Sequence, residues 1–240
     1  MATWVTHLML ADRVLEVIPG LDRQGFCVGN IAPDCNVENK DWTQFVPSRE
    51  ITHWMSGGRK AASDCERFYD EYIAGSRRAD TGQELSFLLG YYAHLIADAE
   101  FQRYIRDASR VASSWARIKE HPVLSSRARG MPESWDSVKK LISKAERMKD
   151  IYTIEAEYLD EHPDSGYLTE ILELKSFPDY IDYLPKGAIV RKIGVMGYLP
   201  RRESGTFPFV AMTREEYSAF LDAAAGQIIR GIARRWLNTF

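Results

Sequence analysis

The most apolar stretch of the chain lies between residues 84 and 105 and reads ELSFLLGYYAHLIADAEFQRYI. Apolar side chains occupy almost every side of the helix that this pattern predicts, which is typical of a helix at the centre of a core. His94 and Asp98 interrupt the pattern four residues apart, so they project from one face of the helix. A buried carboxylate needs a partner or a metal ion. The pair therefore indicates either a structural His–Asp hydrogen bond or half of a metal site.

Before this stretch, the pattern predicts two shorter helices. The first is capped by Thr3 or Thr6 and runs to a Pro-Gly stop at residues 19–20, and the second covers about residues 59–74. Between them, residues 25–36 (GFCVGNIAPDCN) indicate a buried turn that is followed by a polar, irregular segment.

After the central stretch, helical periodicity returns in three segments, at residues 107–120, 134–159 and 167–175. Thr213 and Glu216 have the spacing of a capping box. They predict a final helix that runs from there towards the C-terminus.

Residues 177–209 are rich in proline and glycine and predict a long irregular excursion or a lid. Within it, the apolar triplets at 188–190 and 193–195 indicate short strands or an ordered loop. The expected architecture is all-α, a single multi-helix bundle of 240 residues with its core in 1–175 and 212–240.

Composition narrows the class of protein. An apolar fraction of 45% and a charged fraction of 27% are those of a soluble globular protein. The formal net charge of −3, without a run of Lys or Arg, gives no indication of a nucleic-acid groove. The three cysteines form no CxxC pair and indicate reduced thiols. Because no signal peptide and no transmembrane run is evident, we expect a cytoplasmic protein.

Three of the five histidines, His7, His53 and His94, lie in the first hundred residues among apolar or small neighbours. Asp34 and Asp98 have the same kind of surroundings. Bundle proteins form metal sites when side chains of separate helices converge on one polar point in the core. The pattern therefore predicts that these five side chains meet.

These residues and their motifs resemble the zinc-dependent phospholipase C family, whose wider fold relatives include S1/P1-type nucleases. The resemblance covers about residues 3–105. It rests on the early His7, the GNIAPD turn at 29–34, Thr52-His53, and FLLGYYAHLIAD at 87–98.

The resemblance implies a ligand set for a divalent metal, most simply zinc. A first ion would be held by Asp34, His53, His94 and Asp98. His7 would serve a second ion, with Asp98 bridging the two. Asp34 would also act as general base for the attacking water.

The chain departs from the family pattern in two respects. Trp4 is internal, whereas the secreted enzymes use a processed N-terminal tryptophan as a ligand. The later histidines, His121 and His162, are not followed by a glutamate four residues on, so a third metal is not expected. We expect Glu155, Glu157 and His162 to be solvated.

The resemblance and the residue types predict a metal-dependent hydrolase that acts on a phosphodiester or phosphomonoester, phospholipid-like substrates included. Because no thiolate is present to favour zinc, Fe, Mn, Ni or Co also suit the ligands. The alternative is a non-catalytic, metal-bearing helical protein that binds a ligand or a partner. A phosphohydrolase of the HD type requires adjacent His-Asp residues, and no histidine in this chain is followed by aspartate.

Overall fold

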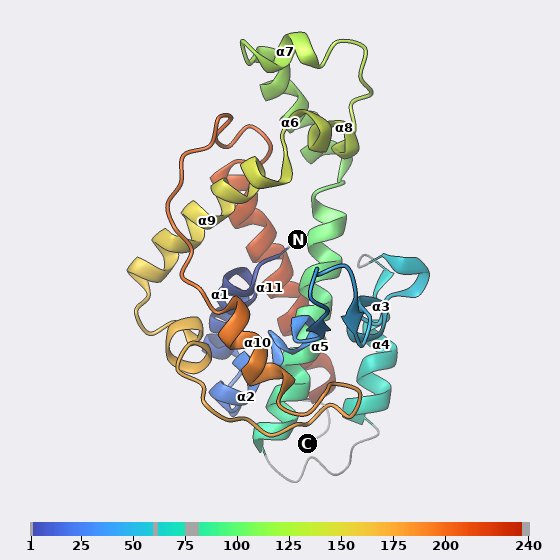
Figure 1. The fold of residues 1–240 in the computed structure, drawn as a ribbon, viewed down its shortest axis with the longest axis vertical. Coiled ribbons are helices and arrows are strands. Elements are labelled where there is room, and N and C mark those ends of the chain that lie inside the picture. Colours follow the sequence, from blue (N-terminus) through green and yellow to red (C-terminus); the bar gives the residue numbers. More distant parts are fainter. Residues whose placement is uncertain (1, 60–61, 75–81, 237–240) are drawn as a thin grey trace. The chain divides into compact units, whose positions relative to one another are not determined.

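The computed structural model describes residues 2–59, 62–74 and 82–236, and its fold is all-α, as the sequence predicts (Figure 1). The described part of the chain divides into two compact units. The larger unit comprises Met1–Glu100, Pro163–Tyr198 and Ala223–Phe240, and the smaller unit comprises Phe101–His162 and Leu199–Asp222. Two of the four boundaries fall inside long helices, α5 (Gly82–Tyr104) and α11 (Arg214–Trp236). All five predicted ligand residues belong to the larger unit.

The larger unit is built from helices, single helical turns and one short hairpin. Its elements are α1 (Trp4–Val17), α2 (Arg23–Gly29), η1 (Ala32–Asp34), β1 (Val37–Glu38), β2 (Phe45–Val46), α3 (Arg49–Thr52), η2 (Ser56–Gly58), α4 (Cys65–Phe68), η4 (Tyr69–Ala74), η5 (Tyr167–Ile171), α10 (Ala188–Met196) and parts of α5 (Gly82–Tyr104) and α11 (Arg214–Trp236).

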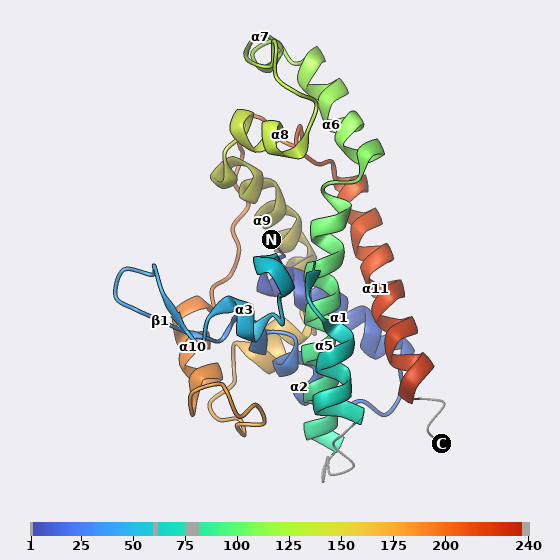
Figure 2. The same cartoon turned by 90° about the vertical axis from the view of Figure 1, so that its right-hand side faces the viewer.

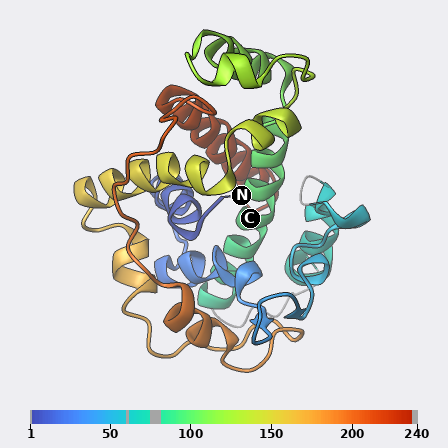
Figure 3. The same ribbon diagram turned by 45° about the horizontal axis from the view of Figure 1, so that its top comes forward.

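Helix α5 is the central helix of this unit, with α1 and α2 on one side and the α3–α4 segment on the other (Figures 1 and 3). Helices α2 and α5 approach so closely that their backbones touch at glycines. A Cβ atom at Gly90 would overlap the carbonyl oxygen of Phe26, and one at Gly29 would overlap that of Phe87. The glycine in the FLLGYYAH motif therefore sets the distance between the two helices.

The chain between η1 and α3 forms a two-stranded antiparallel hairpin, in which Val37 pairs with Val46. The hairpin stands out from the helices beside α10 (Figure 2). The side chain of Lys192 on α10 is 1% exposed, and its ammonium group donates a hydrogen bond to Glu38 Oε2 at 2.5 Å. Arg191 donates to the other oxygen at 2.6 Å. These hydrogen bonds lower the pKa of Glu38 to about 2, so the ion pair persists into acid.

The smaller unit contains α6 (Ala108–Glu120), α7 (Leu124–Arg127), α8 (Trp135–Leu141), α9 (Lys144–Glu161) and the remainders of α5 and α11. The predicted capping box at the start of α11 is present. Thr213 N–H donates to Glu216 Oε2 at 2.9 Å, and Glu216 N–H donates to Thr213 Oγ1 at 3.2 Å. Arg117 completes the network with a 2.8 Å bond to Glu216 Oε2.

Two predictions in the first half of the chain were wrong in detail. The segment predicted as a buried turn is buried but forms the short helix α2, capped by the Asp22 side chain, followed by η1. The second helix begins at Cys65 rather than near residue 59, because Asp64 accepts a hydrogen bond from Arg67 N and caps it there. Residues 60–61 of the predicted range lie outside the described residues.

Two predictions in the second half also required correction. The helix predicted over 134–159 is two helices, because the chain is extended at Ile142 and Ser143 caps α9 through Glu146 N. The irregular excursion at 177–209 contains the helix α10 where strands or a loop were expected. Its buried residues recur at helical spacing: Ala188, Ile189, Lys192 and Ile193. Within the described residues no helix is long and apolar enough to cross a membrane.

Candidate metal centre

The structure brings together the five side chains that the sequence singled out. His7 lies in the first half of α1, Asp34 ends η1, and His53 follows α3 directly. His94 and Asp98 project from α5 one turn apart. His7, His53, His94 and Asp98 are fully buried, whereas the side chain of Asp34 is 16% exposed. Asp34 is therefore the member of the group that faces solvent.

Three ligand atoms of this group lie close to His53 Nε2. His53 Nε2 lies 3.3 Å from Asp34 Oδ1, 3.4 Å from His94 Nε2 and 3.5 Å from Asp98 Oδ2. His94 Nε2 lies 3.6 Å from the same oxygen of Asp98. Hydrogen bonds between charged partners are shorter, about 2.7–2.9 Å. Ligands about 2.0–2.1 Å from a tetrahedral cation lie about 3.3–3.4 Å from one another, so the observed spacing fits a metal ion.

His7 extends the group on one side. Its ring stacks on that of His94, with centroids 3.8 Å apart and planes 7° from parallel. Its Nε2 atom lies 3.9 Å from Asp98 Oδ1, whereas the other carboxylate oxygen faces His53 and His94. Asp98 thus presents one oxygen to each half of the group. The group therefore contains two overlapping triads that could hold a metal ion, His7–His94–Asp98 and Asp34–His53–His94.

The orientation of the His94 ring is fixed by the backbone of the GNIAPD turn. His94 Nδ1 lies 2.7 Å from the carbonyl oxygen of Asn30, which can only accept a hydrogen bond. Nδ1 therefore carries the proton, and in the neutral ring Nε2 directs its lone pair at Asp98 and His53. Hydrogen bonds of this kind from the second ring nitrogen are typical of metal-binding histidines.

His53 has an equivalent contact on its own Nδ1 atom, which lies 2.9 Å from Thr52 Oγ1. When Nε2 serves as a ligand, Nδ1 is protonated and donates to this hydroxyl. Asn30 and Thr52 lie in the GNIAPD and Thr52-His53 motifs, which by themselves predict no role for either residue. Their positions, one turn before Asp34 and directly before His53, are the signal that could have found them.

Cys35 lies beside Asp34 and does not enter the donor set. Burial, and then the neighbouring Asp34 carboxylate, raise the pKa of the Cys35 thiol well above its usual value. The protonated thiol donates to the carbonyl oxygen of Ile31 at 3.3 Å. The donor set is therefore nitrogen and oxygen only.

Electrostatics also favour a dication at this point. The buried carboxylate of Asp98 and the largely buried one of Asp34 together carry two negative charges close to three imidazoles. A bound dication would neutralise both carboxylates and leave the histidines uncharged, which removes the cost of burying unpaired charge. Both the chemistry of the donors and their spacing thus fit a divalent metal.

The other candidates that the sequence raised have separate environments. Glu155 is 1% exposed, so the expectation that it is solvated was wrong; it lies on the inner face of α9 with Ile151 and Leu159. Glu157 accepts hydrogen bonds from Arg214 on the surface of the smaller unit. His162 is exposed and stacks on Tyr158.

Comparison with known proteins confirms the resemblance in the N-terminal part of the chain. Residues 6–100 match the family described as Zinc dependent phospholipase C. The match covers less than half of the 240 residues and includes all five residues of the group. No curated protein and no solved structure matches the chain.

Proposed function

We propose that the protein is a metal-dependent hydrolase that cleaves a phosphoric ester with an activated water molecule. The observation that carries the proposal is that His53 Nε2 lies 3.3–3.5 Å from ligand atoms of Asp34, His94 and Asp98, with His94 Nε2 3.6 Å from Asp98. The family match over residues 6–100 supports the same reaction class and a lipid-like substrate.

Within this proposal, the four residues hold a first ion. His53 and His94 bind through Nε2 and are oriented through Nδ1, and Asp34 and Asp98 supply oxygen. His7 and the second oxygen of Asp98 hold a second ion. The 3.9 Å separation of His7 Nε2 from Asp98 Oδ1 supports this arrangement.

A dication bound by such ligands lowers the pKa of a coordinated water towards neutrality and polarises a phosphoryl oxygen. Zinc suits the donors and the family match, and Fe, Mn, Ni or Co are compatible with the same atoms. The metal count within the proposal is one or two.

Asp34 has a separate task in the proposed reaction. Its side chain is the only one of the five with measurable exposure, so a water molecule from solvent can reach it. A carboxylate that binds metal through one oxygen keeps the other for a hydrogen bond. We assign this second oxygen of Asp34 as the acceptor of the proton that the attacking water loses.

The experiment uses protein purified without an affinity metal. It is incubated with a phosphodiester, a phosphomonoester and a phosphatidylcholine dispersion, with and without EDTA, and after addition of Zn²⁺, Mn²⁺, Co²⁺ or Fe²⁺. We expect hydrolysis of at least one ester that EDTA abolishes and added metal restores. His53→Ala should be inactive, and His162→Ala, an exposed histidine outside the group, should keep wild-type activity.

Lack of turnover of every ester under every metal would overturn the proposal. Stoichiometric metal without turnover would favour the alternative, a non-catalytic protein that carries the metal while binding a ligand or a partner.

A further inference from the structure

Two tyrosine hydroxyls are hydrogen-bonded to the residues on either side of His53, Thr52 and Trp54. Tyr91 belongs to α5, one turn before His94, and is fully buried. Tyr183 comes from the segment that connects η5 to α10, and its hydroxyl donates a 2.8 Å hydrogen bond to the hydroxyl oxygen of Tyr91. Neither residue belongs to the two triads of the candidate metal centre.

The two hydroxyls form a chain whose direction is fixed by its ends. Trp54 Nε1–H, which can only donate, bonds to the hydroxyl oxygen of Tyr183 at 3.1 Å. The Tyr91 hydroxyl donates at 2.5 Å to the carbonyl oxygen of Thr52, which can only accept. Each tyrosine hydroxyl therefore accepts one hydrogen bond and donates one. The direction of every hydrogen bond in this series is thus fixed.

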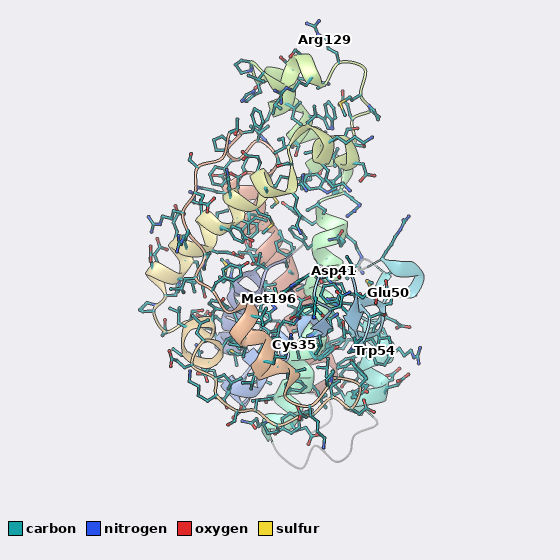
Figure 4. The ribbon with its side chains drawn as sticks, viewed as in Figure 1. Cys35, Asp41, Glu50, Trp54, Arg129 and Met196 are labelled. Atoms are coloured by element: carbon teal, nitrogen blue, oxygen red, sulfur yellow. The ribbon has the colours of Figure 1, made fainter. Side chains whose placement is uncertain are left out.

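This hydrogen-bonded chain begins at Trp54 and ends at Thr52, the two sequence neighbours of His53. Thr52 is held by its carbonyl and Trp54 by its indole. Trp54 has φ 50°, in the left-handed region that residues other than glycine rarely adopt. Figure 4 labels Trp54 beside the α3–α4 segment. The hydrogen bond to Tyr183 and an edge contact with Phe68 hold the side chain of this strained residue.

Packing keeps the two phenols neutral and in place. The Tyr91 ring stacks on Phe68 with centroids 4.6 Å apart, and the Tyr183 ring meets Tyr72 edge-on at 6.0 Å. Burial raises the pKa of Tyr183 to about 12 and raises the pKa of Tyr91 well above its usual value. Both hydroxyls therefore remain protonated donors at neutral pH.

The backbone that this chain holds also carries the hydroxyl next to the imidazole. Thr52 Oγ1 lies 2.9 Å from His53 Nδ1. A shift of the Thr52 backbone moves this hydroxyl, and with it the hydrogen bond that sets the ring orientation. The orientation of the His53 ring thus depends on Tyr91 and Tyr183, although neither hydroxyl is hydrogen-bonded to the ring itself.

We propose that Tyr91 and Tyr183 are positioning residues for the metal ligand His53, and that they act through the hydrogen-bonded chain from Trp54 to Thr52. The inference rests on the proposed function, in which His53 binds a metal ion. In this inference the segment around Tyr183 stabilises the Thr52–Trp54 backbone that carries His53.

The test compares three substitutions that each remove one hydroxyl. Tyr91→Phe and Tyr183→Phe interrupt the hydrogen-bonded chain from Trp54 to Thr52. Tyr180→Phe is the matched control, because Tyr180 lies in the same segment and also bonds to α5, through Gln83 Oε1 at 3.0 Å, but is not part of the chain. Metal-free protein is titrated with Co²⁺ against a competing chelator, and the visible d–d spectrum of the bound ion is recorded. Circular dichroism verifies that each variant is folded.

We expect Tyr91→Phe and Tyr183→Phe to bind Co²⁺ about tenfold more weakly than the wild type and to shift its d–d bands, because outer-shell partners contribute about 10–100-fold to metal affinity. Tyr180→Phe should match the wild type in both respects. Wild-type affinity and spectrum in both chain variants would overturn the inference alone and leave the proposed function standing. An equal loss in Tyr180→Phe would also overturn it, since the effect would then come from loosening the segment. A wild type that binds no Co²⁺ would overturn the proposed function together with the inference.

Discussion

At the scale of single residues, His94 illustrates how the chain prepares an imidazole to bind metal. One nitrogen donates to the Asn30 carbonyl, one face stacks on His7, and the remaining nitrogen is left facing Asp98 and His53. Such a ring has lost its rotational freedom before an ion arrives, so the cost of ordering it is met by folding.

Replacement of His94 by alanine removes a donor common to both triads. We expect His94→Ala to lose stoichiometric metal, and to unfold at a lower temperature, because a buried aromatic ring is replaced by a cavity. Elemental analysis of the folded variant at a temperature below its midpoint checks the first point. Full metal content in this variant would show that the ligand assignment is wrong.

Asp34 is expected to contribute to the reaction more than to stability, since its side chain is partly exposed. In Asp34→Asn the amide oxygen can still approach the metal but cannot accept a proton. We expect hydrolysis to fall by about 10²–10⁴-fold, with a thermal midpoint close to that of the wild type. Steady-state kinetics on metal-saturated protein measure the effect, and activity within a factor of two would exclude Asp34 as the base.

The residue scale also shows which parts of the site are open to prediction from sequence. His94 and Asp98 are visible because a polar pair interrupts an apolar helix at a spacing of four. The carbonyl of Asn30 is not, since every residue has a carbonyl group and only the close approach of α2 to α5 brings this one to His94. Contacts that use the backbone leave no mark on the side-chain pattern.

At the scale of elements, the crossing of α2 and α5 supports the site. Gly29 and Gly90 let the two backbones touch, and this places the end of α2 against His94. Helix boundaries were harder to predict than helix positions. The capping side chains of Asp64 and Ser143 determine where α4 and α9 begin. The periodicity of apolar residues does not reveal these capping positions.

Gly90→Ala tests this crossing. Alanine is favoured over glycine inside a helix by about 1 kcal/mol, but its Cβ would overlap the Phe26 backbone, which cannot move aside as a flexible side chain can. We expect a net loss of more than about 1 kcal/mol in the free energy of unfolding, as for other overpacked cores, together with weaker metal binding.

The control for this substitution is Gly194→Ala in α10. A Cβ atom at Gly194 would meet nothing within 4 Å. Helix propensity alone then applies, so we expect this variant to gain stability by about 0.5–1 kcal/mol. Urea denaturation of the two variants measures both changes, and a stabilised Gly90→Ala protein would contradict the account of the crossing.

At the scale of the whole molecule, the division into two compact units is a feature that the sequence did not predict. The single-domain organisation stays a prediction. The family match and the candidate metal centre both fall in the larger unit, whereas the smaller unit has its own polar networks around Glu216 and Asp150. Two of the four unit boundaries lie inside α5 and α11, where the helices continue across them, so no composition shift marks these two.

Asp150 gives the stability of the molecule a pH dependence of its own. Burial raises its pKa to about 6, although its Oδ2 atom accepts a hydrogen bond from Phe209 N. Because this exceeds the unfolded value of about 3.9, the group's contribution to stability is fully present below about pH 4 and is lost as pH rises through 6. We expect Asp150→Asn to be more stable than the wild type by about 1–2 kcal/mol at pH 8.

This advantage should disappear near pH 4–5, where the wild-type carboxyl is itself protonated in the folded state. Urea denaturation of both proteins in EDTA, at several pH values, separates the effect from metal loss. A difference between the two proteins that does not change with pH would show that the carboxyl titrates normally.

The central claim is that a metal ion lies among Asp34, His53, His94 and Asp98. The most direct measurement is anomalous diffraction at the zinc edge from crystals of the protein grown with Zn²⁺. The account predicts a peak about 2.0–2.2 Å from His53 Nε2, His94 Nε2 and an oxygen of each carboxylate. A map without a peak there, with the same side chains joined directly by short hydrogen bonds, would contradict it.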